Sequence, residues 1–387
     1  MNNIQYIGCD DAEMSLFESQ YVTPQGMCYN SYLILDQKVC VMDTVDPRKT
    51  DEWLQKLHAA LQGRQPDYLV VQHMEPDHSG SIAAFRAAYP AATIVTSAKA
   101  LQFMAQFNPG CDLGQTLIVK EGDRLELGSH TLCFVTAPMV HWPEVIMTYC
   151  PEEKVLFAAD GFGKFGVYDA DPDDWACEAR RYYFNICGKY GAPVSAVLKK
   201  AAGLDIQTIC PLHGPVLEGE KLAEALRLYT IWSSYGIETQ GVLVAHASIH
   251  GNTAACAERL AEMLRQKGCP KVVVADLCRD DMAEVIEDAF RMHRLIVCGA
   301  SYDGDVFPPM HLFLWKLQLK AFQNATVGIV ENGTWAPTAG RAMRALLEPM
   351  KNVTLLEPQV TIKSALKDSD LSALESLADA MMGEMKK

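Results

Sequence analysis

The sequence lacks several patterns that would place it in particular protein classes. It has thirteen cysteines but no Cys-x-x-Cys, so no zinc ribbon, ferredoxin or rubredoxin-type site is expected on this chain. Lys and Arg number 34 against 48 Asp and Glu, and the net charge of −14 argues against nucleic-acid binding. The scattered, odd set of thiols, including Cys40, Cys133, Cys210 and Cys298, is typical of reduced core residues.

Signals for export and for membrane insertion are also missing. No apolar run approaches the roughly 20 residues that a membrane helix needs. The first six residues, MNNIQY, lack a basic region followed by an apolar stretch. We therefore expect a cytoplasmic protein with no membrane partner.

The chain is long enough for two or three globular domains, with 387 residues of which 49% are hydrophobic and 21% charged. In the first part, short strands predominate and helices lie between and outside them, which fits two sheets packed within layers of helices. The strands are expected at 32–35, 39–43, 68–71, 92–96, within 117–137, and at 145–149, 155–159 and 206–210, with helices at 51–61, 81–88 and 217–235.

After Gly236, strands and helices alternate regularly. Five apolar strands are expected at 242–245, 272–274, 295–298, 327–330 and 353–356, and helices at 253–266, 282–292, 309–319, 339–350 and 369–385. This alternation is typical of a doubly wound α/β sheet, which binds ligands at the carboxyl ends of its strands. We predict two domains, residues 1–238 and 239–387.

The segment His73-Met74-Glu75-Pro76-Asp77-His78 holds four potential metal ligands, and it directly follows the apolar run 68–71. Two carboxylates between two histidines are costly at the end of a core strand unless a cation neutralises them. The alternative is a polar loop of chance composition. The ligand preferences of metal sites favour a metal centre.

Three further ligand-type residues follow strands: His141 opens His-Trp-Pro-Glu, Asp160 follows 155–159, and His213 follows 209–212. A single histidine after a strand is usually structural, but three such residues beside a four-ligand segment favour a metal role. Seven ligands suffice for two metals if one carboxylate bridges them. The histidines that match no motif are expected to be structural or surface residues: His58, His130, His246, His293 and His311.

A hydroxyl-rich loop lies between the first strand and the first helix of the second domain. Hydroxyl and backbone N–H groups at a helix N-terminus form a phosphate site. Because the loop contains no Lys or Arg, it suits a flavin mononucleotide better than a nucleoside triphosphate, although ordinary helix capping is the alternative. The loop residues are Ser248, Ile249, His250, Gly251, Asn252 and Thr253.

Two other strand ends carry glycine and aromatic residues, where a flat ring would need backbone hydrogen bonds and a stacking face. Tyr302 and Trp335 are the candidates for ring contact. The two segments contribute Ser301, Tyr302, Asp303, Gly304 and Asp305, and Asn332, Gly333, Thr334 and Trp335.

The motifs His-x-Glu-x-Asp-His, His-Trp-Pro-Glu, Phe-Ala-Ala-Asp-Gly-Phe-Gly and Leu-His-Gly-Pro together resemble those of flavodiiron proteins. The resemblance covers essentially the whole chain. It implies an α/β protein with an N-terminal αββα metallo-β-lactamase-like sandwich, followed by a flavodoxin-like doubly wound sheet of five parallel strands. It also implies a ligand set, in which His73, Glu75 and His141 bind one iron, Asp77, His78 and His213 bind the other, and Asp160 bridges.

The same resemblance implies a function. Proteins of this family reduce O2 to water, NO to N2O, or both, at the diiron site, with electrons from FMN. A head-to-tail homodimer, or a dimer of such dimers, would place one subunit's FMN beside the other subunit's irons. Because the chain ends soon after its last expected helix, we expect a separate electron donor such as a rubredoxin or a reduced deazaflavin.

Two alternatives of other classes remain open. Zinc hydrolases of this fold typically carry a histidine where Glu75 stands, and a carboxylate there favours a harder, higher-valent metal such as iron. A zinc hydrolase with an appended flavodoxin domain would nevertheless keep this ligand set. An FMN electron carrier or gas sensor without turnover would bind the flavin and use the first domain as a scaffold.

Overall fold

The computed structural model describes residues 3–171 and 173–385. Contacts divide the chain into a first unit, made of residues up to 183 and 192–230, and a second unit, made of 184–191 and 231 onward. The domain boundary between 238 and 239 stays a prediction. None of the described helices is long and apolar enough to cross a membrane.

The first unit is a sandwich of two six-stranded sheets. One sheet has the order β1 (Ile4–Tyr6), β6 (Tyr32–Leu35), β7 (Val39–Met42), β8 (Tyr68–Val70), β9 (Thr93–Thr96) and β10 (Thr116–Ile118). The other has the order β11 (Arg124–Glu126), β12 (Thr131–Thr136), β13 (Ile146–Cys150), β14 (Val155–Phe157), β15 (Thr208–Cys210) and β16 (Leu217–Glu218). Buried side chains of both sheets, such as Ile34 and Phe134, form one core between them.

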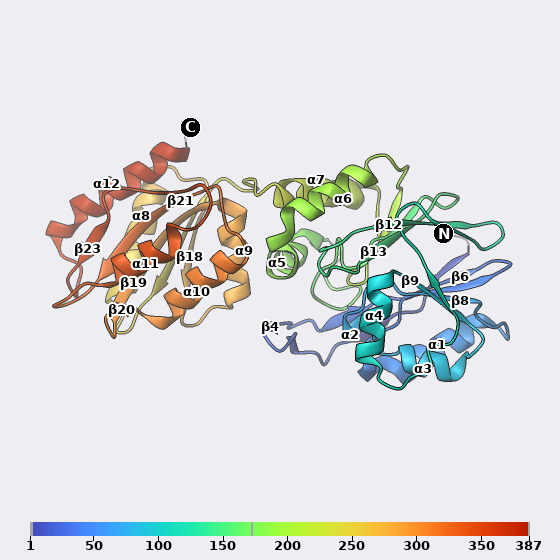
Figure 1. Ribbon diagram of the computed structural model, residues 1–387. Coiled ribbons are helices and arrows are strands. Elements are labelled where there is room, and N and C mark those ends of the chain that lie inside the picture. The colour runs from blue at the N-terminus through green and yellow to red at the C-terminus, as the bar shows by residue number, and fades with distance from the viewer. Residues whose placement is uncertain (1–2, 172, 386–387) are drawn as a thin grey trace. The chain divides into compact units, whose positions relative to one another are not determined.

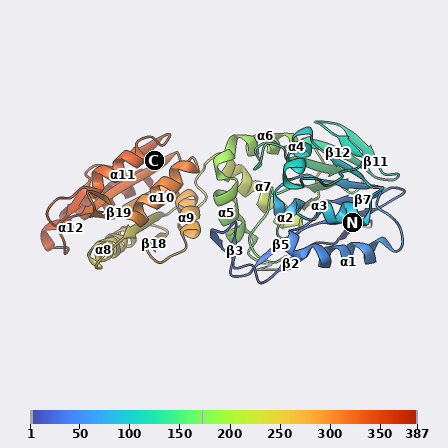
Figure 2. The ribbon, with the colours of Figure 1, turned by 60° about the horizontal axis from the view of Figure 1, so that its bottom comes forward.

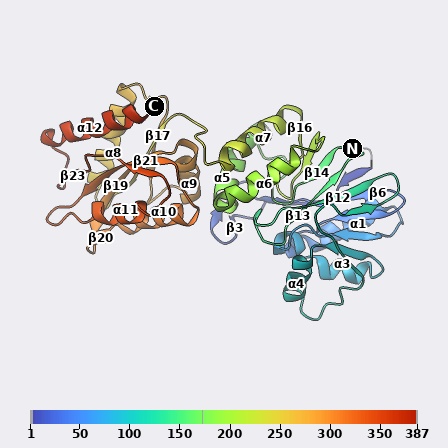
Figure 3. The same cartoon turned by 45° about the horizontal axis from the view of Figure 1, so that its top comes forward.

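Helices cover the outer faces of this sandwich. Helices α1 (Thr50–Leu61), α3 (Ile82–Ala88) and α4 (Ala98–Phe107) accompany the first sheet, and α6 (Gly191–Ala201) and α7 (Gly219–Ser233) accompany the second (Figures 1 and 3). Helix α5 (Trp175–Ile186) precedes α6 in the chain. The unit is therefore the αββα sandwich that the sequence predicts.

Several features of the first unit differ from the sequence prediction or were missed, and the missed ones include strand β1 and helix α4. Residues 217 and 218 form β16 rather than the start of a helix, because they pair with β15, and α7 begins only at Gly219, whose φ is +56°. The short strands β2 (Cys9–Asp11), β3 (Leu16–Phe17), β4 (Tyr21–Val22) and β5 (Met27–Tyr29) were not predicted, and three of them lie along one edge of the unit in Figure 2. Strands of two or three residues are too short to show an alternating pattern.

The second unit has the predicted doubly wound parallel sheet. The order is β18 (Val272–Asp276), β17 (Val242–Ala247), β19 (Arg294–Tyr302), β21 (Ala325–Asn332) and β22 (Val353–Leu355). The fifth position is split, since β22 pairs with the start of β21 and β23 (Val360–Ile362) pairs with its end. A short strand, β20 (Asp305–Val306), runs antiparallel to β19.

Helices cover both faces of this sheet. Helices α8 (Asn252–Gln266) and α12 (Asp368–Met385) share one face, where they enclose an apolar core with β17 and β19. Helices α9 (Met282–Met292), α10 (Pro308–Leu319) and α11 (Ala339–Leu347) cover the other face (Figures 1 and 3). The carboxyl ends of β17, β19 and β21 therefore meet at one edge, where the predicted flavin segments follow.

The thirteen cysteines are all free thiols, as the sequence predicts. Cys40, Cys210 and Cys298 are buried in the cores, whereas Cys133 on β12 is only half-buried. The alternation of side chains along a strand that lies near a sheet edge explains this difference.

A buried histidine in the second unit makes its stability depend on pH. His293 ends α9, its Nδ1–H donates to the carbonyl of Gln323 at 2.9 Å, and its ring stacks on Phe322. Burial lowers the pKa of His293 to about 4 from 6.5. Below pH 6.5 the unfolded chain takes up a proton on this ring, whereas the folded state keeps the ring neutral. The contribution of neutral His293 to the free energy of unfolding is therefore fully present above pH 6.5 and is lost as the pH falls toward 4.

We expect His293→Asn to flatten this pH dependence by roughly 3 kcal/mol between neutral pH and about pH 4, at 1.36 kcal/mol per pKa unit. Asparagine accepts the left-handed backbone found there (φ +52°) and can still donate to Gln323. Urea unfolding across this pH range measures the slope. The exposed His311→Asn variant should keep the wild-type slope, and an unchanged slope in His293→Asn would contradict the prediction.

Candidate metal centre and flavin pocket

The ligand-rich segment after β8 divides its side chains between two directions. Glu75 is extended, with φ −61° and ψ 138°, because a residue before proline avoids the helical region. Pro76 then starts the short helix α2 (Pro76–Ser79), whose first turn contains Asp77 and His78. The Glu-Pro junction thus separates Glu75 from Asp77, although only one residue lies between them.

Four side chains form the first cluster: His73, Glu75, His141 and Asp160. The Nε2 atom of His141 lies 3.0 Å from Glu75 Oε2 and 2.9 Å from Asp160 Oδ2. The Nε2 atom of His73 lies 3.3 Å from each of the same two oxygens. Ligands about 2.0–2.2 Å from one metal are spaced roughly in this way, so the four atoms can surround a single ion.

The second cluster consists of Asp77, His78 and His213. The Nε2 atoms of the two histidines lie 3.0 Å apart, and Asp77 Oδ2 lies 3.2 Å from His213 Nε2 and 3.4 Å from His78 Nε2. Two imidazole nitrogens directed at one point, beside a carboxylate, are typical of metal ligands.

Asp160 connects the two clusters. Its Oδ2 belongs to the first cluster, and its Oδ1 lies 3.1 Å from Nε2 of His78 in the second. The side chain is fully buried at the end of the loop after β14, where Ala159 has a positive φ of 48°. One carboxylate therefore presents an oxygen to each cluster, which is the arrangement of a bridging ligand.

Neighbouring carboxylates raise the pKa values of histidine rings in the centre, so these rings hold protons that a metal would replace. Although burial lowers the pKa of His73, the carboxylate of Asp160 and hydrogen bonds to Asp160, Glu144 and Glu75 raise it well above its usual value. Burial likewise lowers the pKa of His141, but Asp160 and Glu75 raise it to about 9. Without a metal, protons on the rings balance the carboxylates, and metal binding would release those protons.

The polar atoms of the centre also fit metal binding. Both oxygens of Asp77 and the Oδ1 of Asp160 are buried and accept no well-aligned hydrogen bond from a described residue, although ring nitrogens lie nearby. Burial raises the pKa of Asp160, yet the charges of His73 and His78 and hydrogen bonds from His141 and His73 lower it well below its usual range. Buried carboxylate oxygens without donors are costly unless a cation binds them, so the seven side chains suit two cations.

Backbone contacts hold His78 and His213 in place. The hydroxyl of Thr44 donates to the carbonyl of His78 at 2.7 Å. The buried amide of Asn30 donates to the carbonyls of Pro211 and Gly214, on both sides of His213. The Nδ1 atom of His213 donates to the carbonyl of Cys28 at 2.7 Å. Sequence reasoning missed Asn30, because nothing in its segment resembles a motif.

Sequence reasoning also missed Glu144, the last residue of His-Trp-Pro-Glu. Its Oε1 accepts hydrogen bonds from His73 Nδ1 at 2.8 Å and from the Met74 backbone at 2.9 Å. The signal that could have found it is its place in the motif that begins with His141. The five histidines without a motif lie outside both clusters, as expected.

A pocket of about 440 Å³ lies at the carboxyl edge of the second unit's sheet. The predicted segments line it, with Ile249 exposed by 40%, Tyr302 by 44% and Trp335 by 91%. Its lining residues are Ser248, Ile249, His250, Asn252, Thr253, Ala300, Ser301, Tyr302, Asp303, Gly304, Asn332, Gly333, Thr334, Trp335, Ala336, Thr338 and Ser364, without a Lys or Arg among them.

The N-terminus of α8 opens toward this pocket. Gly251 precedes the helix with a φ of +86°, and no side chain caps the first turn. The Oγ of Ser248 is buried without a partner among the described residues. Free N–H groups and an unpartnered hydroxyl at a helix N-terminus fit a phosphate group. Large exposed aromatic faces at Tyr302 and Trp335 fit a flat ring, so the pocket is suited to a flavin mononucleotide.

Some of the residues that were predicted to bind the flavin form hydrogen bonds within the protein instead. The hydroxyl of Ser301 accepts from the backbone of Thr338 at 2.8 Å and of Ala339 at 3.1 Å, at the start of α11. The amide of Asn332 exchanges hydrogen bonds with the Ser364 backbone in both directions. These contacts shape the pocket rather than leave polar groups for a ligand. Ser364 follows the unpredicted strand β23, which explains why it was missed.

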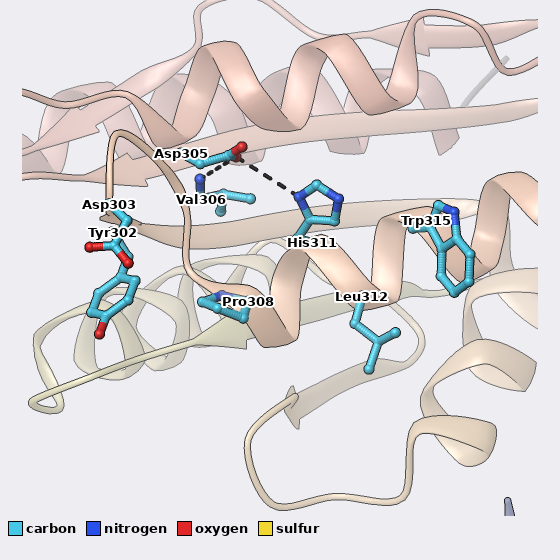
Figure 4. A pocket seen from close by; sticks show the side chains of 8 residues that line it. All are labelled: Tyr302, Asp303, Asp305, Val306, Pro308, His311, Leu312 and Trp315. Carbon is cyan, nitrogen blue, oxygen red and sulfur yellow. Dashed lines mark hydrogen bonds and ion pairs between the residues drawn. The ribbon is translucent and has the colours of Figure 1, made fainter.

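A second hollow of about 390 Å³ adjoins the pocket (Figure 4). Tyr302 and Asp303 line both, whereas Asp305 lines only this hollow and lies 3.9 Å from His311. Leu312 and Trp315 of α10 complete an open, partly apolar wall. Asp303 and Gly304 both have positive φ and form the tight turn between β19 and β20, which directs Asp305 away from the pocket.

Comparisons with known proteins agree with the fold. A family model described as ODP family beta lactamase matches residues 27–214. The uncharacterized protein MJ0732 of Methanocaldococcus jannaschii is 30% identical over 318 residues, which cover 81% of this chain and 79% of that protein. The anaerobic nitric oxide reductase flavorubredoxin of Pectobacterium atrosepticum is 28% identical over 348 residues, 86% of this chain and 67% of that protein.

Solved structures match along the whole chain. Rubredoxin oxygen:oxidoreductase from Desulfovibrio gigas superposes with a TM-score of 0.92 at 25% identity, over 100% of this chain and 98% of that chain. The flavodiiron protein from Giardia intestinalis has a TM-score of 0.93 at 24% identity, over 100% and 97% of the two chains, and shows the common fold.

Fold and site together define a metallo-β-lactamase-like protein with paired clusters for two neighbouring metals and an appended flavodoxin-like sheet. Within this class, the chain belongs to the flavodiiron protein family.

Proposed function

We propose that this protein is an oxidoreductase that reduces O2 to water, NO to N2O, or both, at two irons, with electrons supplied by FMN. The observation that carries the proposal is Asp160, whose two oxygens are directed to two separate ligand clusters. Support comes from relatives whose names describe a nitric oxide reductase and a rubredoxin oxygen:oxidoreductase.

The residues for each iron follow from the clusters. His73, Glu75 and His141 would hold one iron and Asp77, His78 and His213 the other, with Asp160 between them. When bound, the irons supply a redox-active site for a small diatomic gas. Glu75 in place of a histidine supports iron over zinc, because an additional carboxylate stabilises a higher-valent cation.

The chain's own side chains control access to the centre. The side chains of His73, His78, Asp160 and His213 are at most 1% exposed, so bulk water is excluded from most of the site. Glu75 has the largest exposed fraction of the ligand side chains, 16%. A gas would therefore approach beside Glu75. The three ligand carboxylates would offset much of the charge of the cations, and the four neutral rings would complete the ligand set.

The flavin would bind in the pocket of the second unit. Ser248, Asn252, Thr253 and the N–H groups of α8 would bind its phosphate, and Tyr302 and Trp335 would contact its ring. We further propose a head-to-tail homodimer that brings one subunit's flavin beside the other's irons, and a separate donor such as a rubredoxin or a reduced deazaflavin. Sedimentation of the flavin-loaded protein tests the dimer.

One experiment separates this function from its rivals. The purified protein is analysed for metals, reduced without oxygen, and mixed with O2 or NO while flavin reoxidation and gas consumption are recorded. We expect two irons per chain and reoxidation much faster than that of free reduced FMN. Two zincs without iron would indicate a hydrolase, and slow reoxidation would indicate an electron carrier. The ratio of the two rates identifies the preferred gas.

Ser248→Ala and Thr253→Val should weaken FMN binding without changing the metal content. Each removes a hydroxyl from the proposed phosphate site, and a hydrogen bond to a charged group contributes about 1.5–3 kcal/mol, or roughly ten- to a hundredfold in affinity. Fluorescence titration of the flavin-free protein with FMN measures the change. Ser376→Ala on α12 is the matched control, since its hydroxyl bonds only within its own helix. Unchanged affinity in both pocket variants would contradict this phosphate site.

A further inference from the structure

We propose that Glu144 is a positioning residue that fixes the ring of His73 and makes the first cluster the stronger metal site of the two. The inference rests on the proposed function in that it requires metals at the two clusters. It goes beyond that function because Glu144 is not one of the seven ligands, and it distinguishes the two metal positions from each other.

Glu144 forms hydrogen bonds with the ring of His73 and with the backbone of the next residue. Its side chain is fully buried, and its Oε1 accepts from His73 Nδ1 at 2.8 Å and from the Met74 backbone N–H at 2.9 Å. With Nδ1 as the donor, Nε2 of His73 is left as the lone-pair nitrogen facing Glu75 and Asp160. A carboxylate that accepts from the outer nitrogen of a metal-binding histidine fixes both its tautomer and its ring plane.

Local contacts hold Glu144 where this bond requires it. The backbone carbonyl of Glu144 accepts from the hydroxyl of Ser97 at 2.8 Å. Two residues later, the N–H of Ile146 donates to the carbonyl of Gln72, directly before His73. The ring of Trp142 meets that of His73 edge to face at 5.3 Å. One short motif thus provides a ligand, His141, and orients another that lies far away in the sequence.

The second cluster has no equivalent carboxylate among the described residues. His213 donates from Nδ1 to a neutral backbone carbonyl, that of Cys28, and Nδ1 of His78 is buried without a partner. A full negative charge beyond Nδ1 makes the opposite nitrogen a stronger electron donor to a cation than a neutral carbonyl does. The metal beside His73 is therefore bound more tightly, and its higher oxidation state is favoured.

The free oxygen of Glu144 supports this assignment. Oε2 is buried with no hydrogen-bond partner among the described residues. A carboxylate used only to hold backbone would leave an uncompensated buried charge, which is costly. A cation bound by His73 at the first cluster polarises the ring toward Glu144 and compensates the charge of this carboxylate.

The test compares two variants by anaerobic titration of the metal-free protein with Fe(II). Glu144→Gln keeps the shape and an acceptor oxygen but removes the charge, and Glu144→Ala removes both. We expect binding at one of the two sites to weaken about tenfold in the first variant and about a hundredfold in the second, which spans the usual range for outer partners of metal ligands. Affinity at the other site should be unchanged.

Mössbauer spectra of protein loaded with two 57Fe provide a readout that a merely structural role would not move. In Glu144→Gln, one of the two iron signals should change and the other should keep its wild-type parameters. Glu152→Gln is the control, because Glu152 is an exposed carboxylate that accepts from the Thr131 backbone at the surface. If Glu144→Ala fails to fold, Glu144→Gln decides the question.

Two results would overturn the proposal: wild-type binding of both irons in both variants, or equal weakening at both sites. These are distinguishable from a failure of the proposed function, in which the wild-type protein itself binds no iron. The same titration with Co2+, whose visible spectrum reports each site, would then still show whether removing Glu144 weakens one cluster selectively.

Discussion

Replacing Asp160 by asparagine is expected to empty the metal centre. The carboxylate places Oδ2 at 2.9 Å from His141 and Oδ1 at 3.1 Å from His78, so both clusters share its charge. An amide keeps one oxygen but puts an NH2 group, which cannot bind a cation, in place of the other. Removing one partner of a buried ion pair costs about 3–5 kcal/mol, roughly a hundred- to a thousandfold or more in metal affinity.

Metal analysis of Asp160→Asn, purified in parallel with the wild-type protein, measures this loss. Gas consumption by the reduced protein should fall with the metal content, whereas flavin content should stay the same, because Asp160 lies in the other unit. Asp67→Asn is a suitable control, since Asp67 forms a partly exposed ion pair with Lys38. Two irons and full activity in Asp160→Asn would show that Asp160 does not bridge.

Glu75→His should turn the centre from iron toward zinc. Glu75 is the carboxylate that separates this ligand set from the histidine-rich set of zinc hydrolases, and its side chain is 16% exposed. The variant has one anionic ligand fewer, so its first cluster stabilises higher-valent iron less well than the wild-type cluster does. Zn2+, in contrast, readily binds imidazole ligands. We expect gas reduction to fall by at least about a hundredfold, because loss of an outer partner alone costs about 10–100-fold.

The metal content after growth in medium with equal iron and zinc gives the direct measurement for Glu75→His. The zinc-to-iron ratio should rise, and FMN binding should not change. Glu13→His, at an exposed position of the same unit, controls for the addition of a histidine. If Glu75→His keeps iron and wild-type gas consumption, the identity of this ligand does not select the metal.

The seven proposed ligands could be found from the sequence because their chemistry is concentrated at strand ends. Four of them lie within His73–His78, and the others each follow an apolar strand. The structure adds how they divide, since Pro76 starts a helix that directs Asp77 away from Glu75. The assignment of ligands to separate metals came from the family resemblance, because spacing in a sequence does not determine which atoms meet across two sheets.

The positions of some other residues at the two sites could not be predicted from any sequence pattern. Asn30 supports His213 through backbone carbonyls, a contact that any chain position could supply. Ser364 lines the proposed flavin pocket because the fifth strand of the sheet is split and β23 pairs with the end of β21. Asp305 belongs to a predicted segment but lines the neighbouring hollow, since the tight turn at Asp303 and Gly304 reverses the chain.

The sequence by itself determined the two kinds of domain and the types of ligand. Strand and helix periods are local properties, and clusters of histidine and carboxylate at strand ends are costly without a cation. Only the tertiary structure decided which oxygen of Asp160 serves which cluster, and that Glu144 rather than a solvent molecule holds His73. The contact between Glu144 and His73 joins residues 71 positions apart, and its distance depends on how the two sheets pack, which no local pattern encodes.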